Sequence, residues 1–152
     1  MEISFSVFSS IYVVVYKGGM ILERFISEIK VDDENLDIFN HVNNLVFIKY
    51  LEQARFEWYD KHDIQIERLI NKGLGFVLRN IEVSFIGEGR LGDILTIETT
   101  PHKRGNTSFT IKQKISNQNG IEITEAQTTS VMIDMNKRRP IPLIEEIGKY
   151  FD

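Results

Sequence analysis

The segment between about residues 44 and 61 constrains the fold of this chain more than any other. Its large apolar residues are mostly three or four positions apart, as on one face of an α-helix. They are Phe47, Tyr50, Leu51, Ala54 and Trp58. The opposite side carries polar residues, among them Lys49, Gln53 and Glu57. The pattern predicts a long amphipathic helix whose apolar face must be covered by another part of the chain.

Most of the remaining chain has the pattern of β-strands. Five segments are rich in Val, Ile, Thr and Phe, and glycine-containing turns separate the last four. These segments are 21–31, 76–86, 93–100, 107–116 and 121–135. We expect short helices at 64–71 and 143–151, with Pro140 and Pro142 ending the last strand. An antiparallel sheet of this kind has one apolar face, which the long helix can cover. The sequence therefore predicts an α+β fold, an antiparallel sheet wrapped around one central helix.

The composition is that of a soluble, single-domain protein. The chain has 152 residues, of which 42% are hydrophobic and 26% charged, and its formal net charge is −4. This charge gives no electrostatic reason to expect nucleic-acid binding. Without cysteine the chain can form no disulfide, thiolate metal site or cysteine nucleophile, which suits a reducing compartment. We therefore expect a cytoplasmic protein.

Residues 1–19 differ in pattern from the domain expected at residues 20–152. A secretory signal would carry a basic residue ahead of its apolar run, whereas the charge found there is Glu2. The run is also shorter than the roughly 20 residues that cross a membrane, so no membrane insertion is expected. Residues 1–19 are then either an extra edge strand or sequence translated upstream of a start at Met20. We favour the second interpretation.

The stretch LDIFNHVNN, residues 36–44, lies directly before the predicted helix. Asparagine is a favoured helix N-cap, so Asn43 is expected to accept a hydrogen bond from a backbone N–H of the first turn. Asp37 has the position of a turn residue that bonds its own backbone, and His41 that of a polar loop residue. Taken one at a time, these residues need no functional explanation.

Taken together, the residues from Asp37 onward resemble a family motif. Hotdog-fold acyl thioesterases of the hydroxybenzoyl-CoA thioesterase class have an aspartate followed four residues later by HVNN or a variant, and then an aromatic helix with an E-x-x-R step. The matching positions here are Asp37, His41, Val42, Asn43, Asn44, Phe47, Tyr50, Glu52 and Arg55. An R-x-G-D turn at residues 90–93 also matches, and the resemblance covers roughly residues 21–147. It implies the same helix-on-sheet fold.

The resemblance also implies a site at the start of the helix. In the family the thioester carbonyl lies at a subunit interface and faces backbone N–H groups, here those near Asn43 and Asn44. Asp37 would be either the base that activates water or the nucleophile, and the Asn44 side chain would position water or the carbonyl. His41 is a further catalytic candidate. The plastid acyl-ACP thioesterases that use this histidine, however, also use an asparagine where this chain has Phe39.

Charged residues elsewhere have two predicted roles. Glu52 and Arg55 are three positions apart on the helix, so we expect a structural ion pair. Lys103, Arg104 and Arg138 are candidates for binding the phosphates of CoA, with solvated surface charge as the alternative for each. If the carrier were acyl carrier protein, the same residues would meet its acidic surface. No metal or other cofactor is expected.

The sequence thus predicts a homodimer or homotetramer that hydrolyses acyl-CoA or acyl-ACP to a free acid and a thiol. Two other functions remain open: a non-catalytic acyl-CoA-binding module and, with less support, a hotdog hydratase or dehydratase. A binding module would not need Asp37. Hydratase chemistry needs a histidine paired with an acid, and no such pair is found around His62 or His102.

Overall fold

A computed structural model of the chain describes residues 9–17 and 20–152. The strands are β1 (Ser9–Lys17), β2 (Met20–Lys30), β3 (Leu74–Phe85), β4 (Ile94–Arg104), β5 (Ser108–Ser116), β6 (Glu122–Asp134) and β7 (Arg139–Pro140). The helices are a short 3-10 turn η1 (Asp33–Asn35), then α1 (Asn44–Lys61), α2 (Ile66–Asn71) and α3 (Glu145–Gly148).

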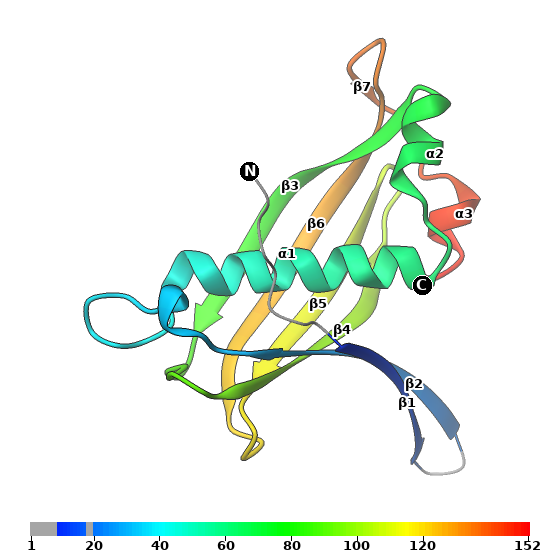
Figure 1. Cartoon of the computed structure of the whole chain (residues 1–152). Coiled ribbons are helices and arrows are strands. Elements are labelled where there is room, and N and C mark those ends of the chain that lie inside the picture. Colours follow the sequence, from blue (N-terminus) through cyan, green and yellow to red (C-terminus); the bar gives the residue numbers. More distant parts are fainter. Residues whose placement is uncertain (1–8, 18–19) are drawn as a thin grey trace.

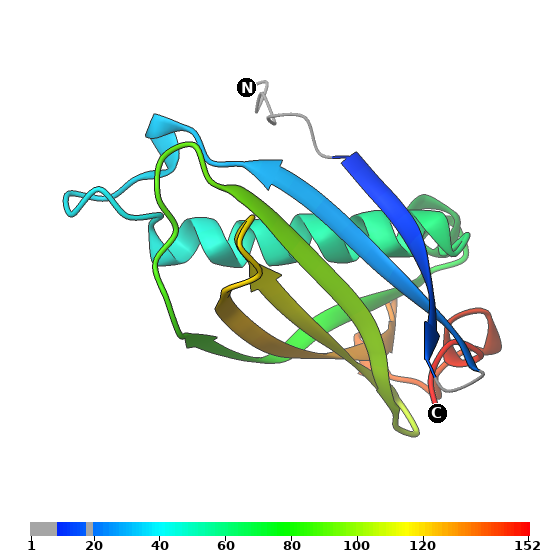
Figure 2. The same cartoon turned by 90° about the horizontal axis from the view of Figure 1, so that it is seen from below.

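The seven strands form one antiparallel sheet that curls around α1 (Figure 1). The strand order is β1-β2-β4-β5-β6-β3, and β7 pairs with the outer part of β6. Seen from below, the sheet curves under the helix, and the loop that precedes α1 projects beyond the end of the sheet (Figure 2). This arrangement confirms the predicted fold class.

Helix α1 has the boundaries that the sequence predicts, for local reasons. Asn43 is its N-cap, and the Asn43 side chain accepts a hydrogen bond from the Leu45 N–H at 2.9 Å. The helix ends at Lys61, where His62 is the C-cap and Asp63 has a positive φ of 56°. A left-handed residue of this kind turns the chain away from the helix axis, so α2 folds back beside β3.

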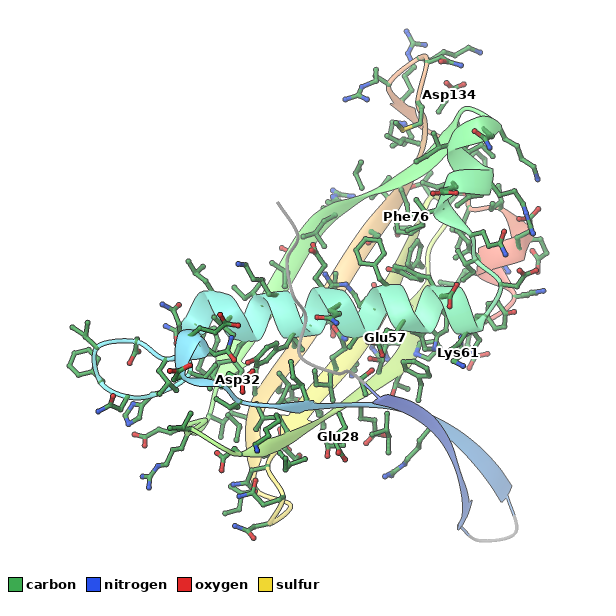
Figure 3. The ribbon with its side chains drawn as sticks, in the orientation of Figure 1. Glu28, Asp32, Glu57, Lys61, Phe76 and Asp134 are labelled. Atoms are coloured by element: carbon green, nitrogen blue, oxygen red, sulfur yellow. The ribbon has the colours of Figure 1, made fainter. Side chains whose placement is uncertain are left out.

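The apolar face of α1 packs on the concave face of the sheet in two clusters. The first includes Phe47 and Leu51, and the second includes Trp58 and Tyr59. In the second cluster the ring of Phe76, on β3, lies 5.0 Å from that of Tyr59, measured between ring centroids (Figure 3). The two clusters together bury the whole apolar stripe of the helix, which holds α1 across the sheet.

A layer of buried polar groups separates the two clusters, with Arg55 at its centre. Arg55 is 6% exposed, and its Nη1 donates to Gln113 Oε1 at 3.1 Å and to Thr128 Oγ1 at 3.4 Å. Burial lowers the pKa of the guanidinium, while Tyr59 and Glu52 act in the opposite direction. The predicted Glu52–Arg55 ion pair is wrong. No ion pair joins these two described residues, because Arg55 turns towards the sheet while Glu52 faces solvent.

Residues 9–17 form an edge strand, one of the two alternatives considered for residues 1–19. β1 pairs with β2 in a register that runs from Ser9 opposite Glu28 to Lys17 opposite Met20. Residues 1–8 and 18–19, which belong to the same predicted extension, lie outside the described residues. The separation of residues 1–19 from the domain at 20–152 stays a prediction.

The C-terminal end differs from expectation in two respects. The helix predicted at 143–151 is the four-residue α3, because the last residues are held by tertiary contacts instead: Phe151 is buried, and the Arg104 N–H donates to the Asp152 carbonyl at 2.7 Å. The strand predicted at 121–135 stops as β6 at Asp134, before the prolines, and Pro140 is instead the last residue of the two-residue β7, which pairs with the end of β6.

Candidate active site

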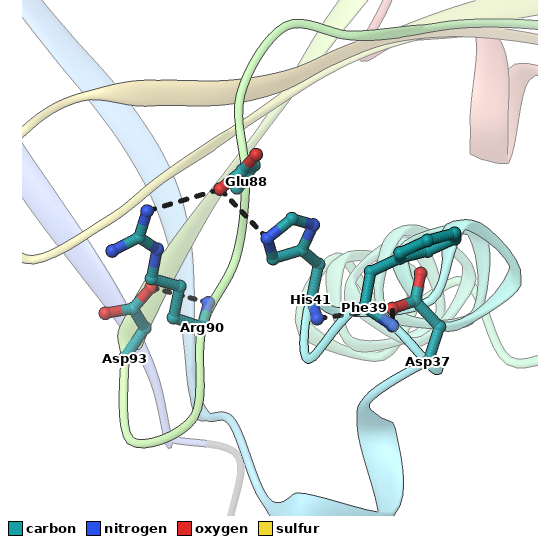
Figure 4. Close-up of polar contacts among 6 residues, drawn as sticks. All are labelled: Asp37, Phe39, His41, Glu88, Arg90 and Asp93. Carbon is teal, nitrogen blue, oxygen red and sulfur yellow. Dashed lines mark hydrogen bonds and ion pairs between the residues drawn. The ribbon is translucent and has the colours of Figure 1, made fainter.

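The segment that precedes α1 forms a small hairpin between η1 and the helix. Leu36 and Val42 form an isolated antiparallel bridge, and the Asp37 N–H donates to the His41 carbonyl at 2.8 Å. The turn is closed by Asn40, whose N–H donates to the Asp37 carbonyl at 3.1 Å and whose φ is +60°. Asparagine tolerates this left-handed conformation better than most residues. The hairpin therefore places Asp37 and His41 opposite each other (Figure 4).

The Asp37 carboxylate is oriented by the backbone of the same hairpin. Its Oδ1 accepts hydrogen bonds from the Phe39 N–H at 2.8 Å and from the His41 N–H at 3.3 Å. This is the turn role expected for an aspartate in that position. Oδ2 has no hydrogen bond from the described residues. The side chain is half-buried, and one of its oxygens fixes its orientation while the other has no partner among the described residues.

The first turn of α1 leaves one backbone donor without a partner. The Asn43 N–H donates to the Asn35 carbonyl, the Leu45 N–H to the Asn43 side chain, and the Val46 N–H to the Asn43 carbonyl. The Asn44 N–H has no acceptor within the described residues. Sequence reasoning placed the donors near Asn43 and Asn44, and the structure leaves Asn44 as the available one. It lies at the positive end of the helix dipole.

His41 contacts an acidic residue that sequence reasoning did not single out. Its Nε2 lies 3.1 Å from Glu88 Oε2, and the same carboxylate oxygen lies 3.3 Å from Nη2 of Arg90 (Figure 4). The Arg90 backbone N–H in turn donates to Asp93 Oδ2 at 2.9 Å. Glu88, Arg90 and Asp93 belong to the loop between β3 and β4, which contains the R-x-G-D turn.

The β3–β4 loop also touches the start of α1 through Gly89. The Val42 N–H donates to the Gly89 carbonyl at 2.8 Å. A Cβ added to Gly89 would lie 2.8 Å from Val42 Cγ2 and 3.1 Å from Phe47 Cζ, closer than the packing allows. Glycine is thus required for this approach. The loop is fixed to both the hairpin and the helix.

A shallow surface groove of about 390 Å³ runs between the hairpin and the β3–β4 loop. It is lined by Leu36, Phe39, Asn40, His41, Arg90 and Leu91. Two apolar side chains that line it are exposed, Phe39 at 71% and Leu91 at 60%, and Ile38 of the same hairpin is 91% exposed. An apolar chain or a further protein surface could bury them.

Of the candidate CoA-binding residues, Lys103 and Arg104 lie near the other end of α1, whereas Arg138 lies in the turn between β6 and β7. Arg104 is the last residue of β4, and its N–H donates to the Asp152 carbonyl. The neighbouring Phe151 packs against Trp58 near the end of α1. An 18-residue helix is about 27 Å long, which separates this end from Asp37. Arg104 is also engaged, since its Nη2 lies 2.8 Å from Glu145 Oε2, whereas Lys103 and Arg138 are exposed. The structure does not bring these residues to Asp37 within one chain.

The described residues contain no group of three or more His, Asp or Glu side chains arranged to hold a metal ion. Among their helices, none is both long enough and apolar enough to cross a membrane.

A curled antiparallel sheet wrapped around one long helix is the hotdog fold. A sequence model of the thioesterase-like superfamily matches residues 31–151, and the chain belongs to this superfamily. The crystal structure of a 1,4-dihydroxy-2-naphthoyl-CoA thioesterase from Synechocystis superposes with a TM-score of 0.78 at 21% identity, covering 84% of this chain and 94% of that one.

Curated relatives act on two different carriers. The long-chain acyl-CoA thioesterase FadM of Escherichia coli is 28% identical over 122 residues, which cover 80% of this chain and 92% of the relative. A chloroplastic acyl-acyl carrier protein thioesterase of Arabidopsis thaliana is 29% identical over 127 residues, which cover 82% of this chain and 66% of the relative.

Proposed function

We propose that the protein hydrolyses an acyl thioester of coenzyme A or of acyl carrier protein to a free acid and a thiol. Membership of the superfamily and the names of the relatives support this activity. The observation that carries the proposal is local. The carboxylate of Asp37 is oriented by hydrogen bonds within the hairpin. The hairpin leads directly into α1, where the Asn44 N–H has no acceptor among the described residues.

The two groups have complementary roles in the reaction. The Asn44 N–H and the positive end of the α1 dipole stabilise the negative charge that develops on the thioester oxygen. In one route Asp37 takes a proton from water, the water oxygen attacks the carbonyl carbon, and the expelled thiolate recovers the proton. In the other, an Asp37 oxygen attacks the carbon and expels the thiolate, and water then hydrolyses the mixed anhydride.

The primary test is release of free thiol from a panel of acyl-CoA and acyl-ACP substrates of increasing chain length. We expect turnover by the full chain, and a large fall in kcat for Asp37→Asn with the circular dichroism spectrum unchanged. Asp60→Asn, the same change on the exposed side of α1, is the matched control. Binding of acyl-CoA without turnover would instead identify an acyl-CoA-binding module.

The oxyanion role of the backbone can be tested with proline. Asn44 is the first residue of α1, where proline is tolerated, and Asn43 before it has the extended conformation that precedes proline (ψ 139°). Asn44→Pro removes the N–H and should lower kcat by about 10²–10³-fold with the helix intact. Asn44→Ala keeps the N–H. If the alanine variant loses as much activity as the proline variant, the side chain is the functional group.

We also propose that a second chain completes the site, because the groove between the hairpin and the β3–β4 loop is open and Lys103 and Arg104 lie near the far end of α1. Antiparallel association of two α1 helices would bring Lys103 of one protomer towards Asp37 of its partner. Mixing Asp37→Asn chains with Lys103→Gln chains should recover part of the activity that each lacks. A monomer in light scattering would rule out a shared site.

A further inference from the structure

The Glu88 carboxylate is the one acidic group in contact with the His41 ring among the described residues. His41 and Glu88 are 47 positions apart and come from different loops, so their contact links the hairpin before α1 to the β3–β4 loop. The link is reinforced by the Val42 N–H, which donates to the Gly89 carbonyl at 2.8 Å. The side chains of His41 and Glu88 are 37% and 51% exposed, so water and substrate can reach the pair.

His41 is in turn connected to Asp37 by two backbone contacts. The His41 N–H donates to Asp37 Oδ1 at 3.3 Å, and the Asp37 N–H donates to the His41 carbonyl at 2.8 Å. The backbone of His41 therefore belongs to the turn that orients the Asp37 carboxylate. We propose that Glu88 is a positioning residue of the active site, which holds His41 and through it the reactive orientation of Asp37. The inference rests on the proposed thioesterase function.

The contact also orients the ring of the histidine. Nε2 of His41 is the ring nitrogen that faces the Glu88 carboxylate, at 3.1 Å. Without that carboxylate the ring can turn about its side-chain bonds, so Glu88 decides which edge of the ring faces the site.

Glu88 is itself held in place by its own loop. The Arg90 guanidinium lies 3.3 Å from the Glu88 oxygen that contacts His41, and the Arg90 N–H donates to Asp93. Asp93 Oδ1 accepts from Gln118 Nε2 at 3.0 Å, which ties the loop to the turn between β5 and β6. The contacts of Glu88 thus extend from the site to the body of the sheet.

The test compares Glu88→Ala, Glu88→Gln, His41→Ala and the Glu88→Ala/His41→Ala double variant. An exposed ion pair is worth at most about 1 kcal/mol, so Glu88→Ala should lower kcat about fivefold and change KM less than twofold. Glu88→Gln keeps the size of the side chain and loses its charge, so it should lose as much activity as Glu88→Ala, because the charge holds His41. In the His41→Ala background, removal of Glu88 should have no further effect. Glu125→Ala, an exposed glutamate on β6, is the control.

Two results would overturn the positioning role: an unchanged kcat in Glu88→Ala, or a loss that multiplies with that of His41→Ala. Imidazole ¹⁵N shifts of His41 provide a readout that does not require turnover. They should differ between the parent chain and Glu88→Ala, because the carboxylate beside Nε2 is removed. A parent chain without turnover in which the ¹⁵N shifts still differ from those of Glu88→Ala would refute the thioesterase proposal but not the contact. Identical ¹⁵N shifts in both chains would refute the contact.

Discussion

Gln113 is the centre of the polar contacts between α1 and the sheet, and its replacement by leucine should destabilise the protein strongly. Gln113 is 1% exposed. Its Nε2 donates to the Leu51 carbonyl of α1 at 2.9 Å and to Thr99 Oγ1 at 3.1 Å, and its Oε1 accepts from Arg55 at 3.1 Å. Leucine has a similar volume and makes none of these bonds, so the substitution removes polar contacts without opening a large cavity.

The magnitude follows from the kinds of bond that are lost. A neutral hydrogen bond contributes about 1 kcal/mol and one to a charged group about 1.5–3 kcal/mol. The Arg55 guanidinium would also lose its closest acceptor while remaining buried. We therefore expect Gln113→Leu to lower the free energy of unfolding by about 3–5 kcal/mol. Gln127→Leu, the same change on the outer face of β6, should cost about 0.5 kcal/mol or less.

A double variant distinguishes this explanation from a simple packing defect. Arg55→Met replaces the buried cation with an apolar side chain of similar length, so Gln113→Leu/Arg55→Met should cost less than Gln113→Leu alone. Equilibrium urea unfolding, analysed with equal m-values, measures the parent chain, the two single core variants, the double variant and Gln127→Leu. If Gln113→Leu costs no more than Gln127→Leu, or if the two core substitutions simply add, the buried polar layer does not act as described.

Three further predictions concern pH, packing and the N-terminal strand. Burial raises the pKa of Tyr50 and of Tyr59 to about 12, so the unfolded chain loses these protons first, and stability should fall as the pH rises from about 10 to about 12. The tyrosinate absorbance of these two residues should rise only as the far-ultraviolet circular dichroism is lost. If Tyr50 and Tyr59 both ionise near pH 10 while the chain is still folded, the prediction is wrong. Gly89→Ala brings a Cβ within 2.8 Å of a valine methyl and should cost about 1–3 kcal/mol in thermal or urea unfolding, whereas Gly87→Ala, with 3.5 Å to its nearest neighbour, should be tolerated. Deleting residues 1–19 leaves every candidate site residue in place, so activity and cooperative unfolding should persist; aggregation after the deletion would show that β1 protects the edge of β2.

The candidate site was partly predictable from sequence. Asn43 as N-cap follows from asparagine's preference for that position, and the turn role of Asp37 follows from its place ahead of the helix. The sequence did not show which N–H of the first helical turn is left without an acceptor. Asn44 was identified only from the hydrogen-bond partners of the neighbouring N–H groups. Glu88 carried no usable signal, since the chain has 22 acidic residues and none is marked by spacing as the partner of His41.

The sequence alone determined the local elements of this protein: one long helix, the residue that caps it, the strands and the motif that precedes the helix. These depend on periodicity and on contacts between residues a few positions apart. The tertiary structure decided the partners of the charged side chains. Arg55 bonds to Gln113 instead of pairing with Glu52, and Arg104 pairs with Glu145. A long charged side chain can reach many groups, and the fold decides which of them it meets.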